Sequence, residues 1–320
     1  MSERKVKANE IQITRVYEAP VKMVWDAWTD SEQVAKWWGP RGFSITHLEK
    51  DLRPGGFWRY IMHGPDGTNY PNKTVYHEVE KYSRLVYDHG GSDDRPPMFK
   101  VTVTFSEHQG KTTMQMTMAL ESEEAAKKTK KFIKEVGGNS TWDRLAEYLS
   151  TEDKFVINRS FDAPIETLFK MWTDPKHVSQ WTTPKGSTME YIAVDIREGG
   201  EAFYSMLDQL GNRIFGKAKY LKIVAPELLV YTQCFSDENG NIVKPSFAPT
   251  WPTAMLTTVM FSSEGPNQTR VTLEWSVYGE ANEVERKTFH DAKGGMTQGW
   301  TGSLDKLDDY LEDMAKMPKR

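Results

Sequence analysis

Two copies of one pattern lie end to end in this chain of 320 residues. The segments that recur with an offset of 144 positions are Ala19-Pro20 with Ala163-Pro164, Trp28-Thr29-Asp30 with Trp172-Thr173-Asp174, Trp37 with Trp181, Asp51-Leu52-Arg53-Pro54-Gly55-Gly56 with Asp195-Ile196-Arg197-Glu198-Gly199-Gly200, Tyr60 with Tyr204, Met62 with Met206, and Leu85-Val86-Tyr87 with Leu229-Val230-Tyr231. A period this long is typical of tandem domains, because the repeats of a solenoid span only about 20–50 residues. The length also agrees with two domains of ordinary size.

The offset increases in the second half of each copy. Phe105-Ser106 recurs as Phe261-Ser262, 156 positions later, so the second copy carries 12 additional residues, which fall within 236–251. Both copies end in related segments, which begin with Asp143-Arg144-Leu145 and Asp305-Lys306-Leu307. We therefore predict one domain over residues 9–150 and a second over residues 154–315.

Hydrophobic periodicity predicts one order of elements for both copies. In the first copy these are a strand over 11–18, an amphipathic helix after Pro20, a second short helix over 32–38, strands over 43–51, 56–63, 74–82, 84–89, 98–106 and 112–120, a charged helical segment, and a terminal helix after Gly137-Gly138. Strands joined by short turns are antiparallel, and the terminal helix can cover the apolar face of their sheet. We predict an α+β chain in which two curved antiparallel sheets each wrap around a long C-terminal helix.

Charge and cysteine content narrow the class of protein. The formal net charge of -4 and the pI near 6.0 give no electrostatic reason to expect nucleic acid or an anionic membrane as a partner. The polar N-terminus lacks the apolar core of a signal peptide, and no apolar run approaches the roughly 20 residues that span a bilayer. Cys234 is the single cysteine, so no disulfide forms within the chain. We expect a cytoplasmic protein.

The sequence contains neither a phosphate-binding P-loop nor a His-Glu-x-x-His or Gly-x-Ser-x-Gly motif. Cys234 is expected to be a buried, inert thiol. No histidine recurs between the copies. Four histidines of the first copy lie on separate predicted strands and could form a metal site only if their side chains shared one face of the sheet: His47, His63, His77 and His89. We therefore predict no catalytic residue, no metal and no cofactor.

Aromatic residues are the best candidates for a functional site. Large aromatic side chains on one face of a sheet either fill a core or line a cavity. The candidate ligand-binding residues of the first copy are Trp37, Trp38, Trp58, Tyr60, Met62, Tyr87 and Trp142. Those of the second copy are Trp181, Tyr204, Met206, Tyr231, Trp251 and Trp300. The core interpretation stays open for both sets.

Two further features have a structural and a functional interpretation. Asp51 and Arg53, with Asp195 and Arg197, either grip a polar ligand end or form an ion pair beside the Gly-Gly turn, and their spacing places both side chains on one face of a strand. The additional residues of the second copy form either a lid over its pocket or an exposed hairpin tip. We favour the ion pair and the hairpin tip.

The recurring motifs resemble a known superfamily. The Ala-Pro helix start, Trp-Thr-Asp and Trp37-Trp38-Gly39-Pro40 look like the SRPBCC (START-like, Bet v 1-like) superfamily. The Asp-x-Arg-Pro-Gly-Gly turn and the terminal Trp-containing helix are similar to the family named for the C-terminal domain of the heat-shock protein 90 ATPase activator. The resemblance covers essentially the whole chain, twice.

The resemblance implies a helix-grip fold with a cavity between the sheet and the long helix. Relatives bind lipids, sterols, plant hormones or polyketide-like aromatics, some act as cyclases, and one branch stimulates a chaperone ATPase. The second copy departs from the pattern where Trp38-Gly39 becomes Thr182-Thr183, Trp58 becomes Ala202 and Pro54 becomes Glu198. The two pockets are therefore expected to differ.

Three functions follow as hypotheses. The leading one is binding of a small hydrophobic or aromatic molecule without catalysis. The second is an enzyme of the cyclase or hydrolase type that uses polar pocket groups such as Tyr60, Asp51 or His63. The third is a protein-interaction module that regulates a chaperone partner, which the resemblance suggests and the residues themselves do not.

Overall fold

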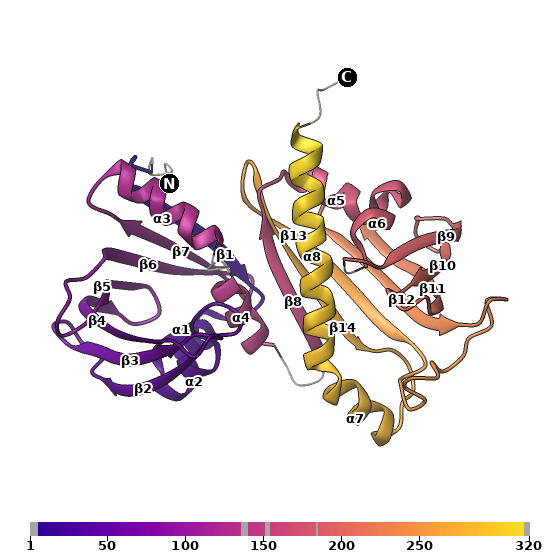
Figure 1. Cartoon of the computed structure of the whole chain (residues 1–320), viewed down its shortest axis with the longest axis horizontal. Helices are drawn as coiled ribbons and strands as arrows, with labels where there is room; N and C mark the ends of the chain where they lie inside the picture. Colours follow the sequence, from indigo (N-terminus) through magenta and orange to yellow (C-terminus); the bar gives the residue numbers. More distant parts are fainter. Residues whose placement is uncertain (1–5, 136–139, 151–153, 184, 317–320) are drawn as a thin grey trace. The chain divides into compact units, whose positions relative to one another are not determined.

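The computed structural model describes residues 6–135, 140–150, 154–183 and 185–316. The chain divides into two compact units, unit 1 (Met1–Leu149) and unit 2 (Ser150–Arg320). Each unit contains a seven-stranded antiparallel sheet together with helices, as predicted for tandem α+β domains of the helix-grip type (Figure 1). None of the described helices is both long and apolar enough to cross a membrane.

Unit 1 contains an antiparallel meander from β2 to β7, to which the first strand is added at one edge. Its elements are β1 (Glu10–Tyr17), α1 (Val21–Thr29), α2 (Ser31–Trp37), β2 (Ser44–Lys50), β3 (Phe57–His63), β4 (Asn69–Glu80), β5 (Arg84–Gly91), β6 (Phe99–His108), β7 (Lys111–Ala119), α3 (Glu123–Glu135) and α4 (Ser140–Tyr148). The strand order is β1-β7-β6-β5-β4-β3-β2. Strand β1 pairs with β7, so β1 and β2 form the two edges of the sheet. The two short helices connect these edge strands in the sequence.

Unit 2 repeats this topology. Its elements are β8 (Lys154–Phe161), α5 (Ile165–Thr173), α6 (Pro175–Trp181), β9 (Thr188–Val194), β10 (Glu201–Leu207), β11 (Arg213–Val224), β12 (Leu228–Ser236), β13 (Met255–Gly265), β14 (Gln268–Val277), α7 (Glu283–Asp291) and α8 (Lys293–Lys316). The strand order is β8-β14-β13-β12-β11-β10-β9, and α8 runs across one face of the sheet (Figure 1).

Local sequence accounts for the start of the short helices in both units. The Asp30 carboxylate accepts hydrogen bonds from the backbone N–H groups of Glu32 and Gln33, and thereby caps α2. The Asp174 carboxylate accepts one such bond, from the backbone N–H of Lys176, and caps α6, while Pro175 occupies the first turn, where its missing N–H costs nothing.

Recurring hydrogen bonds join the two short helices of each unit to each other and to the sheet. The indole N–H of Trp37 donates to the carbonyl of Ala27 at 2.9 Å, and that of Trp181 donates to the carbonyl of Met171 at the same distance. The Thr112 hydroxyl donates to the carbonyl of Ala19 at 2.7 Å, with an equivalent bond in unit 2. Because buried polar groups need partners, these bonds fix the scaffold that the copies share.

Two elements differ from their predicted form. In unit 1 the terminal helix is the nine-residue α4, separated from α3 by residues 136–139, which include Gly137 and Gly138 and lie outside the described residues. Strand β4 begins at Asn69 rather than at residue 74. Pro71 pairs there with Ile61 of β3, while pairing with β5 starts only at Lys73, so the missing proline N–H lies on an unpaired strand edge.

Candidate functional site

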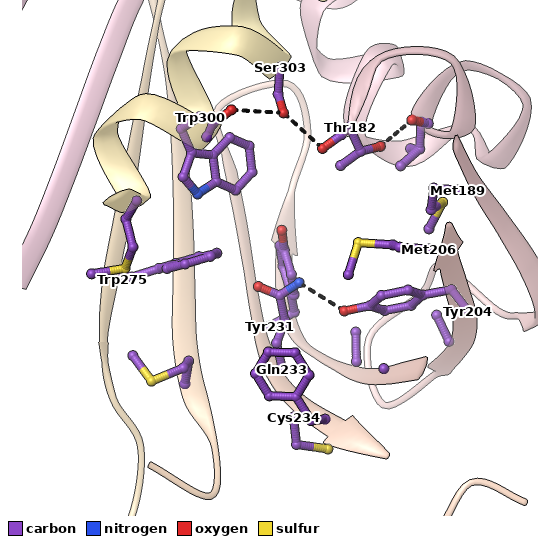
Figure 2. A pocket seen from close by; sticks show the side chains of 18 of the residues that line it. Thr182, Met189, Tyr204, Met206, Tyr231, Gln233, Cys234, Trp275, Trp300 and Ser303 are labelled. Carbon is purple, nitrogen blue, oxygen red and sulfur yellow. Dashed lines mark hydrogen bonds between the residues drawn. The ribbon is translucent and has the colours of Figure 1, made fainter. Parts of the chain in front are cut away.

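Unit 2 contains a cavity of about 730 Å³ between its sheet and α8. Figure 2 shows Trp275 and Trp300 on one side of it, Met189, Tyr204 and Met206 on the other, and Tyr231 and Gln233 between them. The six candidate residues of the second copy, Trp181, Tyr204, Met206, Tyr231, Trp251 and Trp300, all line this cavity. Its size lies within the range of small-molecule sites.

Much of the sheet wall comes from alternate residues of three neighbouring strands, and β9, β13 and β14 add further lining residues. These residues are Ala202, Tyr204 and Met206 of β10, Gly216, Ala218 and Tyr220 of β11, and Leu229, Tyr231 and Gln233 of β12. Strand alternation places every second side chain on the same face. Gly216 is required at its position, because a Cβ atom there would lie 2.7 Å from the Tyr204 ring and hydroxyl.

Helix α8 supplies a wall of small residues. Gly295, Gly299 and Ser303 follow one another at intervals of four, which places them on one helix face toward the cavity. A Cβ atom added at Gly295 or Gly299 would meet no atom within 4 Å. Met296 and Trp300 lie beside this stripe and contribute the larger side chains of the helix wall.

The additional segment of the second copy forms a third wall. The first part of this segment forms a turn around Gly240. Its second part contributes Phe247 and Trp251 to the lining of the cavity. The Lys244 ammonium donates to the Glu285 carboxylate of α7 at 2.6 Å and also to the backbone carbonyl of Trp251. The prediction of a plain hairpin tip is therefore wrong for the second part, which an ion pair fastens against the cavity.

A short hydrogen-bonded chain of polar groups crosses the sheet wall. Thr257 donates to the Gln233 side-chain oxygen at 2.8 Å, and the Gln233 amide nitrogen donates to the Tyr204 hydroxyl at 3.3 Å. Burial raises the pKa of Tyr204 to about 12, and burial raises the pKa of Tyr220 to about 12 as well. Both phenols are therefore protonated at neutral pH.

Charge is scarce around the cavity. Among the described residues that line it, Asp291 at the end of α7 is the one with a charged side chain. Asp291 is exposed and contacts Lys287 and His290, so its charge lies at the surface rather than inside. The interior consists of aromatic, aliphatic and sulfur-containing side chains with a few neutral polar groups.

In unit 1, tryptophans occupy the equivalent space. The stacked rings of Trp28 and Trp142 lie 5.4 Å apart, and Trp38 contacts Trp142 at 6.1 Å and Trp58 at 5.5 Å. Trp58 also stacks on Tyr60 at 4.0 Å. Of the two interpretations left open for these residues, the packing in unit 1 agrees with the core interpretation.

The candidate residues of the first copy are thus placed in a packed core. Those that are buried are Trp37, Trp38, Trp58, Tyr60, Tyr87 and Trp142. Met62 is half-buried and packs against this core. The recurring alignment explains the difference between the units: Trp38, Trp58 and Trp142 correspond to Thr182, Ala202 and Leu304 in unit 2.

The structure also places the polar candidates of the first copy. Arg53 donates to Asp51 at 2.8 Å in an exposed turn after β2, and Arg197 and Asp195 form the same pair. This agrees with the ion-pair interpretation, but the pair lies in a turn rather than on a strand face. Tyr60 faces the core, whereas His63 is held on the surface by Thr46 and Asn69, so the groups proposed for an enzyme do not meet.

The histidines of the first copy and Cys234 lie in different local environments. His77 pairs with Asp88 at 2.9 Å, and His47 accepts the Trp58 indole N–H at 3.2 Å. Burial lowers the pKa of His89 to about 4. Within the described ranges no three His, Cys, Asp or Glu side chains gather as a metal site. Cys234 is a free, half-buried thiol whose pKa is raised by burial.

Several lining residues were missed in the sequence. Tyr220 recurs with Tyr76 at the offset of 144, so the repeat itself contained that signal. Gln233 stands where the first copy has His89, and Gly299 lies in a helix where a glycine normally lowers stability. A glycine at such a position indicates a need for space, but periodicity alone does not tell which face needs it.

Comparison with known proteins assigns the family. A family model described as "Activator of Hsp90 ATPase homolog 1-like protein" matches residues 18–150 and 162–312. No curated protein matches the chain.

Solved structures of bacterial proteins are similar to a little under half of this chain. A protein from Nitrosomonas europaea is 24% identical over 45% of this chain and 96% of its own, with a TM-score of 0.42. A protein from Arthrobacter aurescens is 27% identical over 46% of this chain and 89% of its own, with a TM-score of 0.42. A protein from Staphylococcus epidermidis is 30% identical over 47% of this chain and 93% of its own, with a TM-score of 0.41.

The family model covers most of each unit in turn. The chain therefore belongs to the Activator of Hsp90 ATPase homolog 1-like family, as two tandem SRPBCC domains.

Proposed function

We propose that the chain binds a small apolar or aromatic molecule, and that unit 2 is the binding unit. The observation that carries this proposal is the cavity of about 730 Å³ lined by Trp181, Met206, Trp251 and Trp300. A largely apolar cavity with few polar groups is the usual form of a small-molecule site. Unit 1 then serves as a scaffold domain, because indole rings occupy the corresponding space.

The maintenance of the cavity supports a binding role. Close packing is the default of protein interiors, and side chains that leave room for a cavity give up dispersion contacts with one another. The small residues Ala202, Ala218, Gly295 and Gly299 keep space open from two separate walls. Binding of an apolar ligand would recover those contacts and remove apolar surface from water, at about 25 cal/mol per Å².

The direct test is ligand retention by the full chain. After gentle purification, native mass spectrometry is expected to show a bound small molecule, and the uncharged dye N-phenyl-1-naphthylamine is expected to gain fluorescence on binding. If no retained species is found and neither the dye nor any member of a lipid and aromatic panel binds, the proposal fails.

A single substitution assigns the binding to unit 2. Ala202→Trp introduces the side chain that unit 1 has at Trp58 and is expected to fill the cavity and abolish dye binding. Ala202→Ser keeps the side chain small and is the matched control that retains binding. Far-UV circular dichroism verifies that both variants fold. Undiminished dye binding by the folded tryptophan variant would place the site elsewhere.

The family description supports a second candidate function. It names an activator of Hsp90 ATPase, and its model matches both units. We propose that, in this alternative, the chain stimulates the ATPase of a chaperone partner through its surface. An ATPase assay with purified chaperone tests it, and Ala202→Trp distinguishes the two functions because a surface activity does not need the cavity. Absence of stimulation at saturating chain concentration excludes this candidate.

We further propose that the protein is located in the cytoplasm. With one cysteine and no pairing partner in the chain, the protein suits a reducing environment such as the cytoplasm. Localisation of the full chain by fractionation checks this assignment.

A further inference from the structure

The lining of the unit 2 cavity has an uneven supply of charge and of hydrogen-bond donors. The described lining residues include no lysine, arginine or histidine, and their single carboxylate, Asp291, lies exposed at the end of α7. In contrast, four tyrosines from four consecutive strands line the cavity: Tyr191, Tyr204, Tyr220 and Tyr231. The site therefore offers neutral donors but no cation to a ligand.

Tyr204 is the donor whose partners are best defined. Its oxygen already accepts the Gln233 amide N–H at 3.3 Å, and the Gln233 side-chain oxygen is occupied by Thr257. A phenol has one donor hydrogen in addition to its acceptor positions. Among the described residues no acceptor receives the Tyr204 hydrogen, which leaves it available to a ligand. The hydroxyl points toward the interior of the cavity (Figure 2).

We propose that this cavity selects uncharged molecules that carry a hydrogen-bond acceptor, above all a carbonyl group received by the Tyr204 hydroxyl, and discriminates against the matching carboxylates. The inference rests on the proposed function and specifies the ligand class for the same site. An ionised carboxylate would lose its hydration without gaining a cationic partner, which costs several kcal/mol in proteins. A ketone loses far less, because one neutral donor satisfies it.

The pKa values of the tyrosines show the effect of the same apolar surroundings. Burial raises the pKa of Tyr204 to about 12, and burial likewise raises the pKa of Tyr191 and of Tyr231. The cause is desolvation of the charged form, which acts on any anion placed among these side chains. A bound carboxylic acid is therefore expected to remain protonated in the cavity.

Three ligands of nearly equal shape test the proposal on the full chain. 2-Acetylnaphthalene has a carbonyl acceptor, 2-ethylnaphthalene has none, and 2-naphthoate is an anion at pH 8. Displacement of N-phenyl-1-naphthylamine measures their affinities. We expect the ketone and the hydrocarbon to displace the dye and 2-naphthoate to bind at least tenfold more weakly than the ketone. Equal affinity of 2-naphthoate and the ketone at pH 8 would overturn the inference and leave the proposed function standing.

The acid gives an internal control through pH. If only its protonated form enters, its apparent affinity rises about tenfold for each pH unit between pH 8 and pH 6, because the neutral fraction rises in that proportion. The titratable groups around the site are the tyrosines of β9 to β12, Cys234, and Asp291 with its neighbours Lys287 and His290. The ketone, measured at the same pH values, corrects for their titration. A flat profile for the acid contradicts the proposal.

Tyr204→Phe tests the carbonyl contact separately. Loss of one hydrogen bond is worth about 0.5–1.5 kcal/mol, so the ketone is expected to bind about 2- to 12-fold more weakly, while 2-ethylnaphthalene changes less than twofold. A ketone affinity that is unchanged in a folded variant would remove Tyr204 from the site. Should the dye and all three ligands fail to bind the unmodified chain, the proposed function itself is refuted rather than this inference alone.

Discussion

Three residue positions separate a filled unit from an open one. Trp38, Trp58 and Trp142 interlock in unit 1, where each is less than 9% exposed. The corresponding residues of unit 2 are Thr182, Ala202 and Leu304, which leave out most of three indole rings. An aromatic side chain buries about 150–250 Å², so these exchanges alter both the stability of a unit and the space inside it.

The first prediction concerns Trp58 in unit 1. Trp58→Ala is expected to lower the free energy of unfolding of this unit by about 3–5 kcal/mol, because it removes a buried ring and leaves a cavity. It also deprives His47 of the indole N–H bond at 3.2 Å. Urea unfolding measures the loss. Leu48→Ala, at a residue that is 56% exposed, is the control and should change stability by less than about 0.5 kcal/mol. A cost for Trp58→Ala as small as that of the control would contradict the packing described.

The second prediction concerns the pH dependence of unit 1. Burial lowers the pKa of His89 to about 4 among the rings of Trp38, Tyr87 and Phe99. Below its ordinary value near 6.5, the unfolded chain binds a proton that the folded chain does not, so stability is lost as pH falls from 6.5 toward 4. The loss amounts to at most about 3 kcal/mol.

His89→Gln, which introduces the residue found at position 233 of unit 2, is expected to remove this contribution. Urea unfolding between pH 7 and pH 4.5 compares the variant with the unmodified chain, and their stability difference should move in favour of the variant as pH falls. His108→Gln changes an exposed histidine and should leave the profile as it is. Parallel profiles for all three chains would show that His89 titrates normally.

At the scale of elements, the two units differ in the helices that follow the sheet. Unit 2 has the 24-residue α8, whose small residues face the cavity, whereas unit 1 has α3 and the nine-residue α4. Helix α8 contains four glycines, of which Gly295 and Gly299 line the cavity, and a glycine inside a helix costs about 1 kcal/mol relative to alanine. Their presence in α8 indicates that open space was retained at the expense of helix stability.

The third prediction separates these two effects at Gly299. Gly299→Ala is expected to stabilise unit 2 by about 0.5–1 kcal/mol, because the added methyl group meets no atom within 4 Å and the helix gains propensity. Gly299→Leu extends a larger side chain into the cavity and is expected to weaken dye binding strongly. Thermal unfolding and dye titration measure the two results. Dye binding that tolerates leucine would show that this helix face does not bound the site.

At the scale of the whole molecule, one scaffold occurs twice with two different interiors. The pairing order of the strands, the capped short helices and the indole-to-carbonyl bonds recur. The interiors do not, because substitutions that preserve a sheet face still change its volume. Duplication therefore supports a shared fold, and the cavity is a feature of unit 2 that the fold alone does not require.

The fourth prediction follows from that division. A ligand that binds only the folded form of unit 2 stabilises it by RT ln(1 + [L]/Kd), about 2.7 kcal/mol at a hundredfold excess over Kd. In the full chain, N-phenyl-1-naphthylamine is expected to raise the unfolding temperature of unit 2 and to leave that of unit 1 unchanged. Hydrogen exchange resolved by peptide assigns the protection to each unit. Equal protection in both units would contradict a single binding unit.

The duplication, the α+β class, the order of most elements and the helix caps could be predicted from the amino-acid sequence. These are local or periodic properties: alternation in strands, Asp30 and Asp174 before short helices, and recurring motifs at a constant offset. The six candidate residues that line the cavity of unit 2 could also be predicted, because large aromatic and methionine side chains either fill a core or line a cavity.

Which of the two copies contains a cavity could not be predicted, because it depends on how distant elements pack together. Trp58 and Ala202 occupy the same strand position, and whether the space beside them is filled depends on side chains from α2, α4 and α8 that are distant in sequence. The two-part role of the additional segment likewise depends on the contact of Lys244 with Glu285. A cavity forms where side chains from several elements surround a common space, whereas hydrophobic periodicity describes one element at a time.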